Sequence, residues 1–246
     1  MAPVVDPKSK RYDRQLRIWG AHGQQRLETS SICLLNCGPT GSETLKNLAL
    51  GGISSFTIVD GGKVEARDLG NNFLVCAASL GEPRAKVVTE LLQELNESVS
   101  GSYVEEEPEV LISDNPAFFG GFDLVIATQR KTRLDTGEAR LEEVETRFET
   151  MEARLDKLQT GAAAQLSDPR PPRSAAPRRT VCNLSRRVSM VSNPSLGPTE
   201  LHVVAAFMGG VAAQEAIKLV TRQFVPLAGP LIYNGMAATT CVLDQL

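Results

Sequence analysis

The sequence predicts an α/β fold built on a doubly wound, mainly parallel sheet. Short apolar runs alternate with helical patterns between residues 30 and 129, as expected for parallel strands covered by helices on both faces. The glycine-containing loop NCGPTG directly follows the first apolar run, where phosphate-binding loops lie in such folds. An apolar fraction of 42% in 246 residues is enough for a substantial core.

The expected elements of this sheet follow one another along the chain. Apolar runs predict strands at 31–36, 54–60, 101–106 and 122–129. Helical patterns predict helices at 11–20, 41–52 and 82–96. The last of these begins next to Pro83 and carries its apolar residues on one face. Together these elements form the expected N-terminal part of the domain, residues 10–129.

Residues 130–160 change in character, because they become strongly charged and helical. Their apolar residues follow an a/d heptad pattern from Leu134 to Leu158, and Gly137 is the one weak position. Two interpretations remain open: a short coiled coil that pairs with a partner, or one amphipathic helix lying on its own domain.

The rest of the chain divides into a linker and a returning domain. Residues 161–197 are rich in Pro, Ala and Arg and predict a disordered linker. Residues 198–246 predict the C-terminal part of the same domain. It contains a strongly apolar helix at 199–223, followed by two strands joined by a turn at Asn234-Gly235.

Charge and composition exclude several classes of function. A net charge of −3 gives no electrostatic case for a nucleic-acid or membrane partner. We expect no membrane span, since no apolar run reaches about 18 residues. The N-terminus lacks an apolar signal core, so we expect a protein of the cytoplasm and/or nucleus. The five cysteines and two histidines have no zinc spacing, and we predict no metal site.

The loop NCGPTG departs from the dinucleotide fingerprint G-x-G-x-x-G. Gly38 and Gly41 keep the second and third glycines, but Asn36 replaces the first. Asn tolerates the left-handed conformation, so the turn is expected to persist. Pro39 suits the first position of a helix but lacks an N–H group for phosphate. These residues therefore predict a degenerate nucleotide site.

Two further features could contribute to such a site. Asp60 ends the second strand about 20 residues after the loop, where a ribose-binding carboxylate lies in dinucleotide-binding folds. It could equally cap the end of its strand. The segment RYDRQLRIWG, residues 11–20, could be a solvated amphipathic turn anchored by Trp19, or it could carry an arginine that reaches a phosphate.

The chain resembles a known family over residues 10–129 and 198–246. The blocks RYDRQLRIWGAHGQQRLETSSICLLN and TGSETLKNLALGGISSFTIVDGGKVEARDLGNNFLV are similar to the adenylation fold of ubiquitin-activating enzymes and of their bacterial relatives in molybdopterin and thiamine synthesis, the ThiF/MoeB-like, Rossmann-like fold. DLGNNF and the C-terminal ELHVVAAFMGGVAAQEAIKLVTRQFVPL resemble the regulatory, non-catalytic subunits of the neddylation branch.

The resemblance implies which catalytic residues this chain lacks. Asn36 and Pro39 interrupt the glycine loop, and Gly62 stands where the family carries a second aspartate. Asn71 and Asn72 stand where the family carries Arg and Gln before a Phe. An Asn cannot replace the charge-assisted bonds of a phosphate-binding Arg. The resemblance thus implies a pseudoenzyme that is not catalytic alone, with Asp60, Gly38 and Gly41 as remnants of the cofactor site.

The resemblance also implies a partner. A catalytic subunit would bind ATP and magnesium, adenylate a ubiquitin-like modifier and form its thioester, while this chain binds no cofactor alone. Arg14 matches the family arginine that reaches across the dimer to the partner's ATP, so we expect it to act in trans.

Two alternatives remain open. The usual large helical insertion is missing between the two matching blocks, so the chain could be a truncated, non-functional or competing isoform that still binds the catalytic subunit. It could also be a Rossmann-fold nucleotide-binding oxidoreductase.

Overall fold

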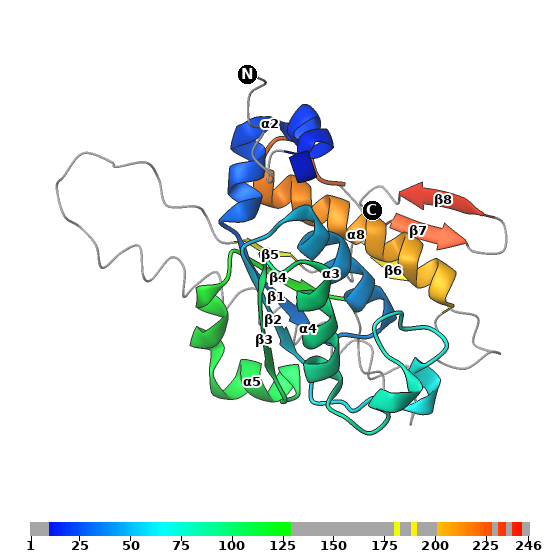
Figure 1. The fold of residues 1–246 in the computed structure, drawn as a ribbon. Coiled ribbons are helices and arrows are strands. Elements are labelled where there is room, and N and C mark those ends of the chain that lie inside the picture. The colour runs from blue at the N-terminus through cyan, green and yellow to red at the C-terminus, as the bar shows by residue number, and fades with distance from the viewer. Residues whose placement is uncertain are drawn as a thin grey trace, which may run out of the picture.

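The computed structural model describes residues 10–128, 180–182, 188–190, 201–227, 231–234 and 238–242. Its centre is a five-stranded parallel sheet in the order β3-β2-β1-β4-β5, with helices on both faces (Figure 1). A second sheet has three strands in the order β6-β7-β8. The predicted α/β class with a mainly parallel sheet is therefore confirmed.

The N-terminal elements follow the predicted order. The strands are β1 (Ser31–Leu35), β2 (Ser55–Val59), β3 (Ser100–Val104) and β4 (Leu124–Ala127). The helices are α2 (Asp13–Glu28), α3 (Pro39–Gly51) and α4 (Arg84–Leu95). Helix α2 is longer than the predicted 11–20 and is kinked at Gly20, whose φ of 68° lies in the left-handed region.

Several short elements were not predicted. They are the 3₁₀ turns η1 (Ala66–Asp68) and η2 (Ala77–Ser79), the helix α5 (Pro108–Asp114) and the 3₁₀ segment η3 (Pro116–Gly121). Each is only one or two turns long, so hydrophobic periodicity has little sequence over which to develop.

The central strands β1 and β4 of the main sheet are buried on both faces. Successive residues of a strand point to opposite faces, so Ile32 and Leu34 of β1 join one core while Cys33 and Leu35 join the other. The larger core contains the buried faces of α3, α4 and α8. The smaller one contains residues of α5 and η3, including Leu111 and Phe119. This double burial explains why the strands are continuous apolar runs.

Helix α8 (His202–Thr221) lies across α3 (Figure 1). A Cβ atom built on Gly209 would lie 2.5 Å from the Cβ of Glu43 and 3.0 Å from the backbone nitrogen of Thr44. The two helices therefore approach each other as closely as a glycine allows. Gly210, by contrast, has nothing within 4 Å of its Cβ position.

The apolar character of α8 corrects one expectation. By length and composition, this 20-residue helix could cross a membrane, although no apolar run of that length was expected. Nearly half of the apolar stretch is buried within the protein, with residues such as Met208 and Ala212 in the larger core. Packing in this core accounts for the apolar residues on the buried part of α8.

The C-terminal half of the chain differs from prediction in two places. Strands β5 (Thr180–Cys182) and β6 (Val188–Met190) lie within the stretch 161–197, so the predicted disorder is wrong for these six residues. β5 pairs with β4, and β6 pairs with β7 (Leu231–Asn234). The predicted heptad helix at 130–160 lies outside the described residues.

The predicted C-terminal hairpin is confirmed, but Asn234 lies in its first strand. β7 pairs antiparallel with β8 (Thr239–Val242), and Asn234 is still paired, opposite Thr239. The predicted turn at Asn234-Gly235 is therefore wrong for Asn234, which belongs to β7.

The crossing of α3 and α8 gives a paired test. Gly209→Ala should lower the free energy of unfolding by about 1–3 kcal/mol, because the added methyl group overlaps α3. Gly210→Ala is the matched control and should be neutral or raise that free energy by up to about 1 kcal/mol, since alanine favours helix. Urea unfolding followed by circular dichroism measures both. The opposite order of stabilities would contradict the close crossing.

Candidate functional site

The candidate site lies at the carboxyl edge of the parallel sheet. Leu35 at the end of β1 is in register with Val59 of β2 and with Ala127 of β4. The residues that follow these three strands therefore share one edge. The chain leaves β1 toward β2 on one side, and β4 lies on the other, so this is the point where the strand order reverses. Ligands bind at such switch points in open α/β sheets.

The loop after β1 adopts the turn predicted from sequence. Asn36 has a φ of 61°, in the left-handed region, and its N–H donates to the carbonyl of Val59 at 2.9 Å. Gly38 caps α3 with extended backbone, and Pro39 is the first residue of the helix. A Cβ on Gly41 would lie 2.6 Å from the Thr128 Oγ1 and 2.8 Å from the Asn36 carbonyl oxygen. Gly41 is thus required for the close packing of loop and helix.

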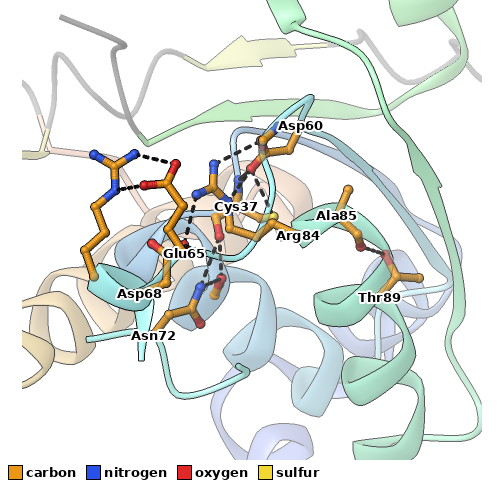
Figure 2. Close-up of polar contacts among 11 residues, drawn as sticks. Cys37, Asp60, Glu65, Asp68, Asn72, Arg84, Ala85 and Thr89 are labelled. Atoms are coloured by element: carbon orange, nitrogen blue, oxygen red, sulfur yellow. Dashed lines mark hydrogen bonds and ion pairs between the residues drawn. The ribbon is translucent and has the colours of Figure 1, made fainter. Parts of the chain in front are cut away.

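Asp60, predicted as a remnant ribose ligand or a strand-end cap, is fully buried and paired (Figure 2). Its two carboxylate oxygens accept a forked pair of bonds from Arg84, from Nε at 2.9 Å and from Nη2 at 3.0 Å. They also accept the N–H groups of Cys37 at 2.9 Å and of Gly62 at 2.8 Å. Both carboxylate oxygens of Asp60, at the end of β2, are therefore occupied by hydrogen bonds from within the chain.

Arg84 is the central cation of the site, and the sequence analysis missed it. Only 8% of the residue is exposed, and its Nη1 also faces the Asp68 Oδ2 at 3.4 Å. A signal was present: Arg84, Val88 and Leu92 are four residues apart and share the buried face of α4. A cation on a buried face, at the helix end that disfavours positive charge, requires a carboxylate partner.

Charge and burial act in opposite directions on the pKa values of Asp60 and Arg84. Burial acts to raise the pKa of Asp60, but the hydrogen bond and charge of Arg84, with the Gly62 and Cys37 N–H groups, hold that pKa below its ordinary value. Burial likewise acts to lower the pKa of Arg84, but the Asp60 carboxylate outweighs it and raises that pKa. Both groups are therefore charged.

The thiols near the sheet are unsuited to nucleophilic chemistry. Cys37 is fully buried with its Sγ 3.2 Å from the Asp60 Oδ2, and burial together with this carboxylate raises the pKa of the thiol well above its usual value. Burial also raises the pKa of Cys33. Cys76 and Cys241 are exposed. Because the thiolate is the reactive form, Cys33 and Cys37 are inert.

Gly62 stands at the position where the resembling family carries a second aspartate. A Cβ built there would lie 2.6 Å from the Arg84 Nη2 and 2.9 Å from the Asp60 Oδ1. The guanidinium group thus fills the space into which a side chain at position 62 would extend.

The two asparagines before Phe73 are buried, and Asn72 makes hydrogen bonds within the chain. Asn72 donates from Nδ2 to the Cys37 carbonyl at 3.2 Å and to the Ser42 Oγ at 3.1 Å, so it ties its loop to the glycine loop. Asn71 is buried. Phe73 is 61% exposed, with the Lys46 Nζ 4.8 Å from its ring centroid. Neither asparagine supplies the positive charge that would bind a phosphate.

A few polar atoms remain unpaired at this edge. Among the described residues, the Asn36 Oδ1, Asn71 Oδ1 and Thr128 Oγ1 are buried without a hydrogen-bond partner. The described residues also hold no group of three acidic, histidine or cysteine side chains that could bind a metal ion. These neutral groups carry no charge toward a triphosphate, and the one buried cation beside them is already paired.

Arg14 lies apart from this network. It is exposed on α2, between the buried residues Tyr12 and Trp19, and it takes no part in the contacts around Asp60. The structure thus groups Asp60 with Gly38 and Gly41 at the loop, and it places Arg14 on a separate surface.

Removing one partner of the buried pair tests its importance. Arg84→Met should lower the free energy of unfolding by about 3–5 kcal/mol, because it leaves the Asp60 carboxylate buried without its cation. Lys86→Met is the control, because Lys86 lies on the same helix but pairs with Glu82 in an exposed i,i+4 ion pair, and this substitution should leave stability nearly unchanged. Denaturant titrations of both variants give the comparison, and equal losses would contradict the assignment.

The pair also predicts acid sensitivity. The pKa of Asp60 is lowered in the folded chain, so its contribution to stability is present above the ordinary aspartate pKa of about 4 and is lost as pH falls through the folded-state pKa. Asp60→Asn should therefore show a shallower decline of unfolding free energy below about pH 4 than the native chain. Parallel slopes in thermal unfolding between pH 2 and 6 would contradict this.

Comparisons with known proteins agree with this geometry. The ThiF family model matches residues 12–241. The chain is 67% identical over 126 residues to the NEDD8-activating enzyme E1 regulatory subunit AXL of Arabidopsis thaliana, which covers 51% of this chain and 24% of that protein. It is 57% identical over 122 residues to the NEDD8-activating enzyme E1 regulatory subunit of Gallus gallus, covering 50% and 23% respectively. The chain thus spans about a quarter of the length of these relatives.

Solved structures give the same fold at low sequence identity. E. coli MccB with MccA-N7isoASN superposes with a TM-score of 0.62 at 13% identity, covering 95% of this chain and 72% of that one. PaaA superposes with a TM-score of 0.60 at 14% identity, covering 99% and 76%. The family match over most of the chain and the shared fold lead to one conclusion: this chain belongs to the ThiF family.

Proposed function

We propose that this chain is a regulatory, non-catalytic subunit of a heterodimeric enzyme that activates a ubiquitin-like modifier in the neddylation pathway. The buried Asp60–Arg84 pair carries this proposal, because it fills the chain's own nucleotide edge with an internal ion pair. The relatives named as NEDD8-activating enzyme E1 regulatory subunits, up to 67% identical, support the pathway.

The chemistry is assigned to the partner. A catalytic subunit binds ATP and magnesium, adenylates the C-terminal glycine of the modifier and receives it on a cysteine as a thioester. We propose that this chain binds no cofactor alone, and the pairing of Arg84, the buried cation at this edge, with Asp60 and Asp68 supports this. Its partners are the catalytic subunit and, through the complex, the modifier; neither nucleic acid nor a membrane is involved. The compartment is the cytoplasm and/or nucleus.

Arg14 is the residue proposed to act on the partner's site. It is exposed near the start of α2, between the buried residues Tyr12 and Trp19. An arginine supplied in trans stabilises the negative charge that develops on a transferring phosphate group, as arginine fingers do. A subunit without its own chemistry would thus still be required for the rate of the reaction.

A second candidate is a competing isoform that binds the catalytic subunit without supporting its activity, since the aligned part of the AXL relative is 24% of that protein. Co-purification with a catalytic subunit, followed by an assay for the modifier thioester, separates the two candidates. Binding with activity supports the regulatory subunit, and binding without activity supports the competitor. Micromolar binding of NAD to the isolated chain would favour an oxidoreductase instead.

Arg14→Ala provides the direct test of the proposed role. In the reconstituted heterodimer it should slow adenylate formation by about 10²-fold or more, since arginine fingers contribute at least that much to phosphate chemistry. Assembly should be unchanged by size-exclusion chromatography. Arg17→Ala is the matched control, because Arg17 is exposed on the same helix but pairs with Asp13 at 3.0 Å, and it should keep nearly full activity. A fully active Arg14→Ala enzyme would remove Arg14 from the mechanism.

A further inference from the structure

The first half of α2, residues 13–19, forms a short arm that carries Arg14, and both ends of the arm are fixed to the domain. We infer that Tyr12, seated on Gly52 and Asn96, is a positioning residue that holds Arg14 for its action on the partner's site. This inference rests on the proposed role of Arg14.

The seat for Tyr12 is formed at the end of α3. Tyr12 is 3% exposed, and it is absent from both hydrophobic cores. Gly52, which caps α3 with a φ of 87°, leaves room for the ring: a Cβ there would lie 2.6 Å from the Tyr12 hydroxyl oxygen and 2.7 Å from Cζ. Only a glycine satisfies both the left-handed cap and the stacked ring.

Asn96 connects this seat to three elements. It caps the C-terminus of α4, and its Nδ2 donates to the Ala49 carbonyl at 2.8 Å and to the Tyr12 hydroxyl at 3.3 Å. Its Oδ1 accepts a bond from the Arg11 Nη1 at 2.9 Å. One buried amide thus holds the start of the arm against the ends of α3 and α4.

The other end of the arm is fixed by Trp19. This residue is 7% exposed, its Nε1 donates to the Gln24 Oε1 at 3.1 Å, and its carbonyl accepts a bond from the Gln223 Nε2 at 2.7 Å. The kink at Gly20 then redirects the chain. Between the two anchors, Arg14, Arg17 and Ile18 are exposed, so the outward face of the arm carries both arginines together with one apolar side chain.

Such anchoring matters because the arm is too short to be helical by itself. A helix of about two turns is unstable in water without tertiary contacts. An unanchored Arg14 would have to be ordered each time it met its target, and that ordering costs binding free energy. Residues fixed before the encounter avoid this cost, and small displacements of a positioning group strongly reduce the rate. Tyr12 lies two residues before Arg14 and is the nearest anchored side chain.

The test is a double-mutant cycle in the reconstituted heterodimer. Tyr12→Ala should slow adenylate formation by about tenfold or more, because Arg14 is no longer held in place. In an Arg14→Ala background the same substitution should change the rate less than about twofold, since no finger remains to be positioned. Tyr12→Phe keeps the ring on Gly52 and should retain nearly full activity. Leu92→Ala, in the core face of α4, is a control for general destabilisation and should leave the rate unchanged at a temperature where the complex is folded.

A second measurement reports on the arm itself. Trp19 is the only tryptophan in the chain, so a red shift of its fluorescence in Tyr12→Ala, with faster tryptic cleavage at Arg14 and Arg17, shows that the arm has loosened. Two results would overturn the inference and leave the proposed function intact. One is equal slowing by Tyr12→Ala in both backgrounds, and the other is a Tyr12→Ala variant with unchanged Trp19 fluorescence and unchanged tryptic cleavage. Full activity of Arg14→Ala itself would instead overturn the proposed role of Arg14, and with it the inference.

Discussion

The buried ion pair between Asp60 and Arg84 is the interaction on which the carboxyl edge of the sheet depends. It joins the end of β2 to the start of α4, and through the Cys37 N–H and Asp68 it reaches the glycine loop and the turn η1. A buried charge is tolerated only when it is paired and hydrogen-bonded, and here each oxygen of Asp60 has at least two donors. The same contacts that satisfy this carboxylate fill the edge where related folds bind ligands.

Glycines set the other constraint, because they decide how closely backbones can approach. Gly41 lets α3 pack against Asn36 and Thr128, while Gly209 lets α8 cross α3 at contact distance. This packing role of Gly41 does not depend on a phosphate bound by the loop. A fold can thus retain part of a nucleotide fingerprint for structural reasons, and fold alone is a poor guide to activity.

Much of this architecture could be predicted from sequence, and the exceptions have physical causes. β1, β2 and the left-handed Asn36 follow from local patterns, so they were found. Arg84 was missed because its partner is 24 residues away, and only its place on the buried face of α4 pointed to a carboxylate. Strands β5 and β6 are three residues each and depend on pairing with β4 and β7, which no local propensity encodes.

The crowding around Gly62 limits which substitutions this part of the structure accepts. An aspartate introduced there would meet the Arg84 guanidinium and the Asp60 carboxylate at sub-contact distances, while a smaller residue at position 84 would first leave Asp60 without its counter-ion. Each of these substitutions alone is therefore expected to destabilise the folded chain. Positions 60, 62 and 84 are thus coupled, so a side chain at position 62 is expected to require a compensating change at position 84.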